Sequence, residues 1–124
     1  MTELKVVKSK VKKEKKFVVV RRNIDNKKEY AAYFPASGRA VLYMKAIVEW
    51  AKKTGSNFEH LVECIIYHEK AHYLHDINSV VFTKCRNGEV LNPQEERACD
   101  EYAIREFFKA HGFKPDINME EWFK

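Results

Sequence analysis

The stretch LVECIIYHEKAHYLH, residues 61–75, decides how this chain is interpreted, because it predicts one helix that carries His68, Glu69 and His72. Apolar side chains flank its centre and predict that most of this helix is buried: Ile65, Ile66, Ala71 and Leu74. His68 and His72 are four residues apart, so on a helix they lie one above the other. The imidazole nitrogens of these two residues can therefore reach the same metal ion.

Glu69 follows the first of these histidines and completes an H-E-x-x-H pattern. Its carboxylate is placed to take a proton from a water molecule activated by the metal. The pattern should arise by accident in fewer than roughly one chain in a hundred of this length. The alternative is a surface helix with solvated histidines, but the apolar flanks favour buried histidines, which need partners.

A catalytic zinc site needs a third protein ligand, and the stretch NPQEERACDEYA at residues 92–103 offers one. Pro93 suits a first helical turn and Asn92 suits the position before it, so a helix should begin here. On that helix Glu96 can ligate the metal. Asp100, one turn later, can accept the free N–H of a ligand histidine and fix its tautomer.

Other interpretations of these residues remain open. The acidic pair could be no more than the solvated start of a helix. His75 continues the histidine face and could be the third ligand, although seven residues of helix span roughly 10 Å. Cys64 could approach the metal from one turn before His68, but a buried cysteine is more often a small apolar side chain, as we expect for Cys99.

The order H-E-x-x-H and then E-x-x-x-D, followed by Ala103, resembles the gluzincins, the thermolysin-type zinc peptidases. The short chain and the order of its elements resemble the compact ImmA/IrrE-like peptidases of bacteria and phages, over roughly residues 36–110. In that group a minimal zincin domain cleaves a transcriptional repressor.

This resemblance implies a Zn²⁺ ion held by His68, His72 and Glu96, with Glu69 as the general base and Asp100 orienting a ligand histidine. The implied activity is hydrolysis of a peptide bond in an intracellular protein substrate. Tyr67, Tyr73, Tyr102, His60 and His111 are candidate donors to the oxyanion, and nothing in the sequence selects one. The alternative function is a zincin scaffold that keeps its zinc and acts as a binding module for nucleic acid or a protein partner.

The remaining pattern predicts an α+β fold, a minimal zincin-like domain with about three helices and a small N-terminal sheet. We expect residues 77–92 to form a loop, with a small hairpin around residues 80–82 as an alternative, and the tail holding Trp122 and Phe123 to dock on the core. Residues 39–43 are the candidate strand for pairing with an extended substrate, unless they form the first turn of the next helix. The expected strands are 17–20, 30–34 and 39–43, and the expected helices are 44–53, about 57–76 and 93–111.

The chain has 124 residues, enough for one small domain. No apolar run is long enough to cross a membrane, and the N-terminus lacks the apolar segment of a signal peptide. Cys64, Cys85 and Cys99 are an odd number without paired spacing, which favours free thiols. We therefore expect a cytoplasmic protein without a membrane partner.

Charge is concentrated at the N-terminus. Residues 1–28 carry eleven Lys or Arg against Glu3, Glu14 and Asp25, a net of +8, so the rest nets −3 and the whole chain +5. We expect residues 1–16 to be a basic arm, with a short strand through its valines as an option, and residues 17–124 to be the metallopeptidase domain. Such an arm can bind nucleic acid or another acidic partner, or be only a solvated terminus.

Overall fold

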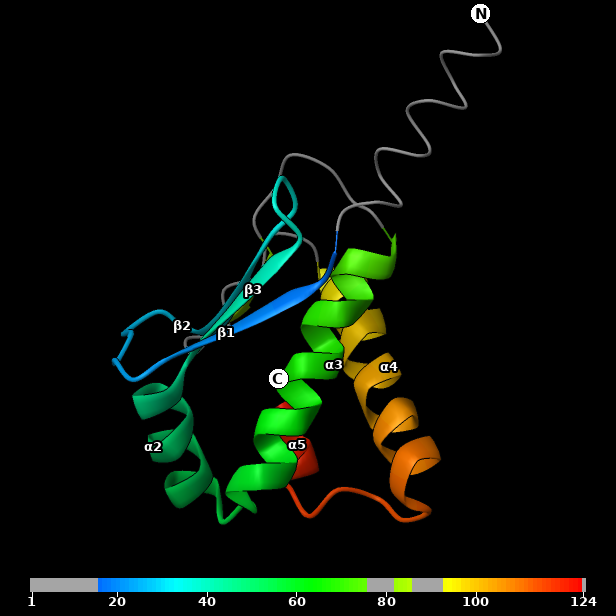
Figure 1. Cartoon of the computed structure of the whole chain (residues 1–124). Coiled ribbons are helices and arrows are strands. Elements are labelled where there is room, and N and C mark those ends of the chain that lie inside the picture. Colours follow the sequence, from blue (N-terminus) through cyan, green and yellow to red (C-terminus); the bar gives the residue numbers. More distant parts are fainter. Residues whose placement is uncertain (1–15, 76–81, 86–92, 124) are drawn as a thin grey trace, which may run out of the picture.

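A computed structural model describes residues 16–75, 82–85 and 93–123 of the chain. The fold is α+β: a four-stranded sheet lies across the upper part of helix α3, and the other helices flank α3 below it (Figure 1). The strands are β1 (Val18–Arg22), β2 (Glu29–Phe34), β3 (Arg39–Tyr43) and β4 (Phe82–Cys85). The helices are α2 (Met44–Thr54), α3 (Phe58–His75), α4 (Pro93–His111) and α5 (Met119–Trp122).

The strand order in the sheet is β1-β3-β2-β4. β2 and β3 form an antiparallel hairpin, whose turn is closed by hydrogen bonds from the Ser37 and Gly38 N–H groups to the Phe34 carbonyl. Gly38 has φ +71°, a conformation that costs little without a side chain. β1 runs parallel to β3, and β4 runs antiparallel to β2.

The three N-terminal strands and the three long helices lie where the sequence predicts them. One role predicted from the sequence is wrong. β3 is bonded to β1 on one side and to β2 on the other, so it has no free backbone edge with which to pair a substrate. The edge strands of the described sheet are β1 and β4. β4 also lies within the segment predicted to be a loop, so the sheet is not formed only by the N-terminal part of the chain.

Helix α3 begins where local chemistry favours it. Gly55, at φ +70°, ends α2, and the Asn57 side chain accepts a hydrogen bond from the His60 N–H at 3.0 Å. This bond satisfies one of the donors that a helix N-terminus leaves unpaired. At the other end of α3, the side chain of His75 lies outside the described residues, as do Asn92 and the predicted strand in the basic arm.

Helix α4 packs along α3 and starts at Pro93, as predicted. It ends at His111, and Gly112 follows with φ +79°. The tail then returns to the start of α3, where the Asn57 N–H donates to the Asp116 carbonyl at 2.7 Å. The predicted docking of the tail on the core is confirmed, since Trp122 is 1% exposed and its ring lies 6.0 Å from that of Trp50.

The core lies between the sheet and the helices. Its largest fully buried apolar side chains come from every long element: Tyr33, Leu42, Ile47, Leu61, Ile65, Phe107 and Trp122. In the described part of the chain, no helix is long and apolar enough to span a membrane. Because the buried side chains come from the sheet and from the helices, the core packs α3 against both the sheet and α4. This packing fixes the face of α3 that carries the histidines.

Candidate metal centre

Helix α3 supplies a buried group of three polar side chains. His68, Glu69 and His72 each offer one potential ligand atom, and these atoms lie within 4.8 Å of one another. All three side chains are fully buried, in contrast to the usual exposure of His and Glu. The predicted helix geometry is thus confirmed, and this buried group could hold a metal ion.

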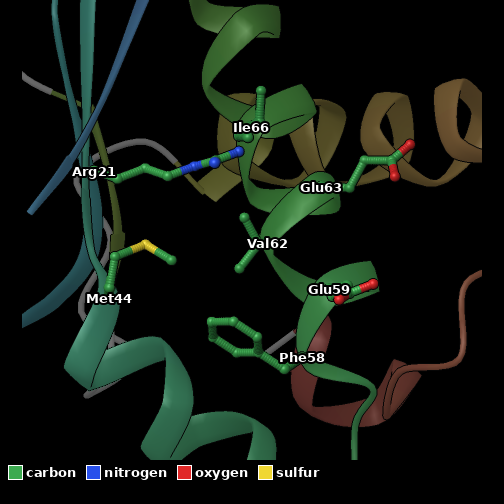
Figure 2. A pocket seen from close by; sticks show the side chains of 7 residues that line it. All are labelled: Arg21, Met44, Phe58, Glu59, Val62, Glu63 and Ile66. Carbon is green, nitrogen blue, oxygen red and sulfur yellow. The ribbon is translucent and has the colours of Figure 1, made fainter. Parts of the chain in front are cut away.

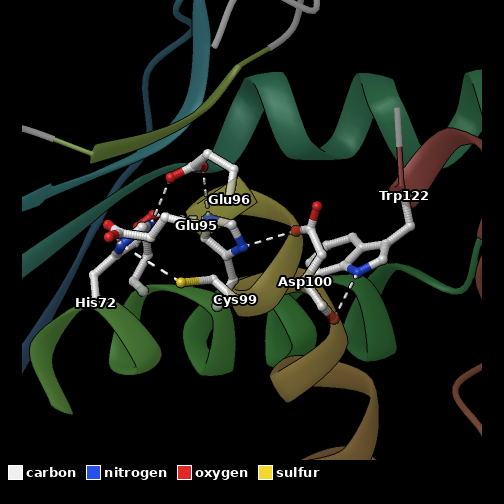
Figure 3. Close-up of polar contacts among 8 residues, drawn as sticks. His72, Glu95, Glu96, Cys99, Asp100 and Trp122 are labelled. Carbon is white, nitrogen blue, oxygen red and sulfur yellow. Dashed lines mark hydrogen bonds and ion pairs between the residues drawn. The ribbon is translucent and has the colours of Figure 1, made fainter. Parts of the chain in front are cut away.

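Helix α4 brings Glu96 to the same point. One carboxylate oxygen of Glu96 lies 3.1 Å from Nε2 of His68, and the other lies 2.9 Å from Nε2 of His72. Figure 3 shows the Glu96 side chain directed toward His72 from the first turn of α4. Two nitrogens from one helix and a carboxylate from another therefore converge, which a single helix cannot achieve.

These distances suit a shared metal ion. Two atoms bonded at about 2.0–2.1 Å to one tetrahedral ion lie roughly 3.3–3.4 Å apart. The nitrogen–oxygen separations in the cluster are 2.9 and 3.1 Å, so the side chains need to move apart by only a few tenths of an ångström. The donor set of two imidazoles and a carboxylate therefore fits such an ion.

The outer nitrogen of His68 is held by Asp100. Its Nδ1 lies 2.7 Å from Oδ1 of Asp100, as the sequence predicted for a ligand histidine. Asp100 is itself positioned by Trp122, whose indole N–H donates to the Asp100 carbonyl at 3.2 Å (Figure 3). A carboxylate on Nδ1 keeps the proton on that nitrogen and turns the lone pair of Nε2 toward the centre.

His72 has its own outer partner, which the sequence did not reveal. Nδ1 of His72 lies 3.3 Å from Oε2 of Glu95 and 3.5 Å from Sγ of Cys99. The only sequence signal for Glu95 is its position beside Glu96 in the first turn of α4. Burial raises the pKa of the Cys99 thiol, and its Sγ lies beside Nδ1 of His72 rather than beside the Nε2 atom that faces Glu96. Cys99 is not in the group of possible metal ligands found among the described residues.

The carboxylates strongly favour the charged form of His68. Burial alone would lower the pKa of its imidazole, but hydrogen bonds with Asp100 and Glu96 raise it from the usual 6.5 to about 10. Burial would likewise raise the pKa of Glu96, but hydrogen bonds with His68 and His72 lower it from 4.5 to about 2. In this metal-free arrangement a proton on His68 compensates part of the negative charge that a metal ion would neutralise.

Carboxyl groups outnumber imidazoles at this centre by two. The carboxyl groups are those of Glu69, Glu95, Glu96 and Asp100, and the imidazoles are those of His68 and His72. Burying uncompensated charge is costly, and a divalent cation would remove this excess. The excess of carboxyl groups and the ligand geometry therefore both favour a divalent cation at this centre.

The remaining candidates from the sequence are not part of this cluster. Cys64 is buried but does not belong to the group of possible metal ligands found among the described residues. Tyr67 donates to Glu63 at 3.1 Å and His111 lies 2.7 Å from the same Glu63 oxygen, while Nδ1 of His60 accepts from the Asp116 N–H. These three candidates for the oxyanion donor are therefore engaged elsewhere in this structure.

Comparisons with models of known protein families, with curated proteins and with solved structures find no match for this chain. The gluzincin pattern thus stays a resemblance carried by His68, Glu69, His72, Glu96 and Asp100. The chemistry of the centre has to be argued from its own geometry.

Proposed function

We propose that this protein is a zinc-dependent metallopeptidase. The observation that carries the proposal is the convergence of His68 and His72 from α3 with Glu96 from α4, beside the fully buried Glu69. Two imidazoles and one carboxylate form a common ligand set for catalytic zinc, in which the fourth position is left to water.

Each residue of the centre would have its own role in hydrolysis. His68, His72 and Glu96 would hold the zinc ion, which supplies Lewis acidity and lowers the pKa of water toward about 7. Glu69 would accept the proton of the attacking water and pass it to the leaving amine. Its Oε1 atom lies 4.0 Å from Nε2 of His68, close enough for a water molecule at the centre to reach it.

The outer residues would keep the ligands in position. Asp100 and Glu95 each face the Nδ1 atom of one histidine, so both Nε2 atoms are directed at the centre. Partners of this kind typically contribute 10–100-fold to metal affinity or activity. We assign both residues as positioning residues.

An extended peptide substrate would pair with β4. The Tyr33 ring on β2 lies 6.3 Å from the His72 ring, and Tyr33 is in register with Phe82 on β4. β4 is therefore the edge strand beside the one that contacts a ligand histidine. Its outer backbone edge could bind a protein or peptide substrate by strand addition.

A second candidate function is supported by the burial of the centre. His68, Glu69 and His72 are fully buried, which is typical of a metal site that stabilises a fold and unusual for one that admits a large substrate. In this alternative the zinc would support a binding module. In such a module Glu69 would be a fourth ligand that closes the site. We favour the peptidase because a Glu directly after the first His is the arrangement that serves as general base in H-E-x-x-H sites.

The two functions can be separated by Glu69→Gln. We expect zinc content near one per chain in both wild type and variant, with hydrolysis of fluorescein-labelled casein by the wild type only. Equal hydrolysis by the variant would contradict the role of Glu69. Full zinc content with no hydrolysis by the wild type, on casein and on a mixed peptide library, would favour the binding module.

A further inference from the structure

A groove of about 370 Å³ lies on the side of α3 away from α4. Its floor is apolar, formed by Met44 at the start of α2 and by Phe58, Val62 and Ile66 on α3 (Figure 2). This volume falls in the range of small ligand pockets. On α3, His68 and His72 occupy a different face from the residues that line the groove, whereas Glu69 follows Ile66 by three residues and lies one turn beyond the groove.

One strand carries an unexpected residue into this groove. Along β1, Val19 and Arg21 are in register with Ala40 and Leu42 of β3, both fully buried core residues. Paired residues in a sheet point to the same face, so Val19 and Arg21 both point toward the helices. Val19 packs against the core, whereas Arg21 places a guanidinium group where the pattern calls for an apolar side chain.

Among the described residues, the charge of Arg21 has no partner. It is exposed, and it makes no ion pair or hydrogen bond within the part of the chain that the structure describes. In Figure 2 it extends from β1 toward Ile66, while the carboxylates of Glu59 and Glu63 point away from it. Glu63 is already engaged by Tyr67 and His111. Arg21, Glu59 and Glu63 all line the groove, and of these three charged side chains Arg21 is the one that points across it.

In the described sheet, the backbone strand beside this groove has a neighbour on one side only. β1 is the terminal strand of the described sheet, with β3 on its inner side only. An unpaired strand edge can bind an extended peptide through main-chain hydrogen bonds, with side-chain pockets giving specificity. The apolar floor and Arg21 would then read alternate side chains of the added strand.

We propose that this groove is a docking site for an extended peptide that bears an acidic side chain between apolar ones. The peptide would add to the free edge of β1, its carboxylate would pair with Arg21, and an apolar side chain two residues away would enter the groove. The inference goes beyond hydrolysis at the metal centre and does not depend on it. It gives the protein a second surface for recognising a protein partner.

The test uses the full chain, labelled with ¹⁵N, and the probe peptide acetyl-Thr-Leu-Thr-Glu-Thr-Leu-Thr-amide. We expect amide shifts concentrated in β1 and in the first half of α3, and Arg21→Gln should weaken binding at least about fivefold, the size of a desolvated charge pair. Arg22→Gln is the matched control, because the next residue of the strand points to the opposite face. A peptide with Lys in place of Glu should bind Arg21→Glu better than it binds wild type.

Three results would overturn the proposal. They are no shifts at millimolar peptide, equal effects of Arg21→Gln and Arg22→Gln, and shifts confined to β4. An inward charge on an edge strand can also serve only to prevent association between sheets. Self-association of Arg21→Gln without any peptide binding to the wild type would assign Arg21 to that role. A dispersed amide spectrum of each variant shows that it remains folded.

Discussion

An ordinary surface helix buries its apolar face and exposes its polar face, whereas two faces of helix α3 show the reverse. The face toward α4 buries His68 and His72 completely, while the face toward β1 leaves the apolar Phe58 and Ile66 half-buried in an open groove. A buried polar group needs a partner, and an exposed apolar surface often marks a binding site. This contrast is why we propose a metal ion as the partner of the first face and a peptide as the partner of the second.

The largest effect should come from removing a ligand on the buried face. His72→Ala should reduce zinc affinity by more than the roughly 10–100-fold expected for an outer partner, because one of three protein ligands is lost. It should also lower the melting temperature in the presence of zinc, since metal binding contributes to folding. Ile66→Ala, on the groove face, is the control and should retain zinc. Full zinc content in His72→Ala, measured by elemental analysis, would remove the basis for this centre.

A second prediction separates two adjacent glutamates. Glu96→Gln removes a direct ligand, whereas Glu95→Gln removes only the carboxylate beside Nδ1 of His72. We expect a loss of zinc affinity of about tenfold for Glu95→Gln and a much larger loss for Glu96→Gln. Titration against a competing chelator measures both. The reverse order would make Glu95 the ligand.

A third prediction concerns the stability of the metal-free protein as pH changes. The raised pKa of His68 contributes stability that is complete below its unfolded value of 6.5 and is lost as pH rises through about 10. The lowered pKa of Glu96 contributes stability that is complete above 4.5 and is lost as pH falls through about 2. Both contributions are therefore complete only between pH 4.5 and 6.5.

Urea unfolding with a chelator present should thus show stability falling from pH 6.5 to 9. With zinc bound the trend should reverse below neutrality, because protons compete with the metal for His68. His68→Gln should remove the alkaline decline in the metal-free protein. A decline of the same size in that variant would assign it to another group.

The smallest effect should come from the basic arm. Deleting residues 1–16 should leave zinc content unchanged, because the proposed ligands all lie on α3 and α4. If the arm binds nucleic acid, affinity for a DNA duplex should fall steeply with salt and be lost on deletion. A truncated protein that loses zinc would show that the arm supports the centre.

Local sequence patterns predicted most of the elements. Gly55 and Gly112 mark helix ends, Pro93 marks a helix start, and the spacing of His68 and His72 places both on one face. These features depend on residues within one or two turns of each other. That is why the elements could be anticipated from local patterns. The convergence of Glu96 and Asp100 with the histidines was predicted on another ground, the need of a catalytic zinc site for a third ligand and the resemblance to the gluzincins.

Contacts between distant segments could not be read in this way. The pairing of Glu95 and Cys99 with His72, the place of β3 inside the sheet and the addition of β4 all depend on how the elements pack. The propensity of residues 39–43 predicts a strand but does not specify which segments become its neighbours, because strand pairing depends on residues far away in the chain.

Local sequence patterns specified helix α3 and the candidate ligand side chains, because side-chain chemistry and helical period are local properties. The packing of the elements set which nitrogen each carboxylate meets, which strands lie at the edges of the described sheet, and that Arg21 faces an apolar groove. Those outcomes depend on the register and packing of segments far apart in the chain, where many arrangements satisfy the same local pattern.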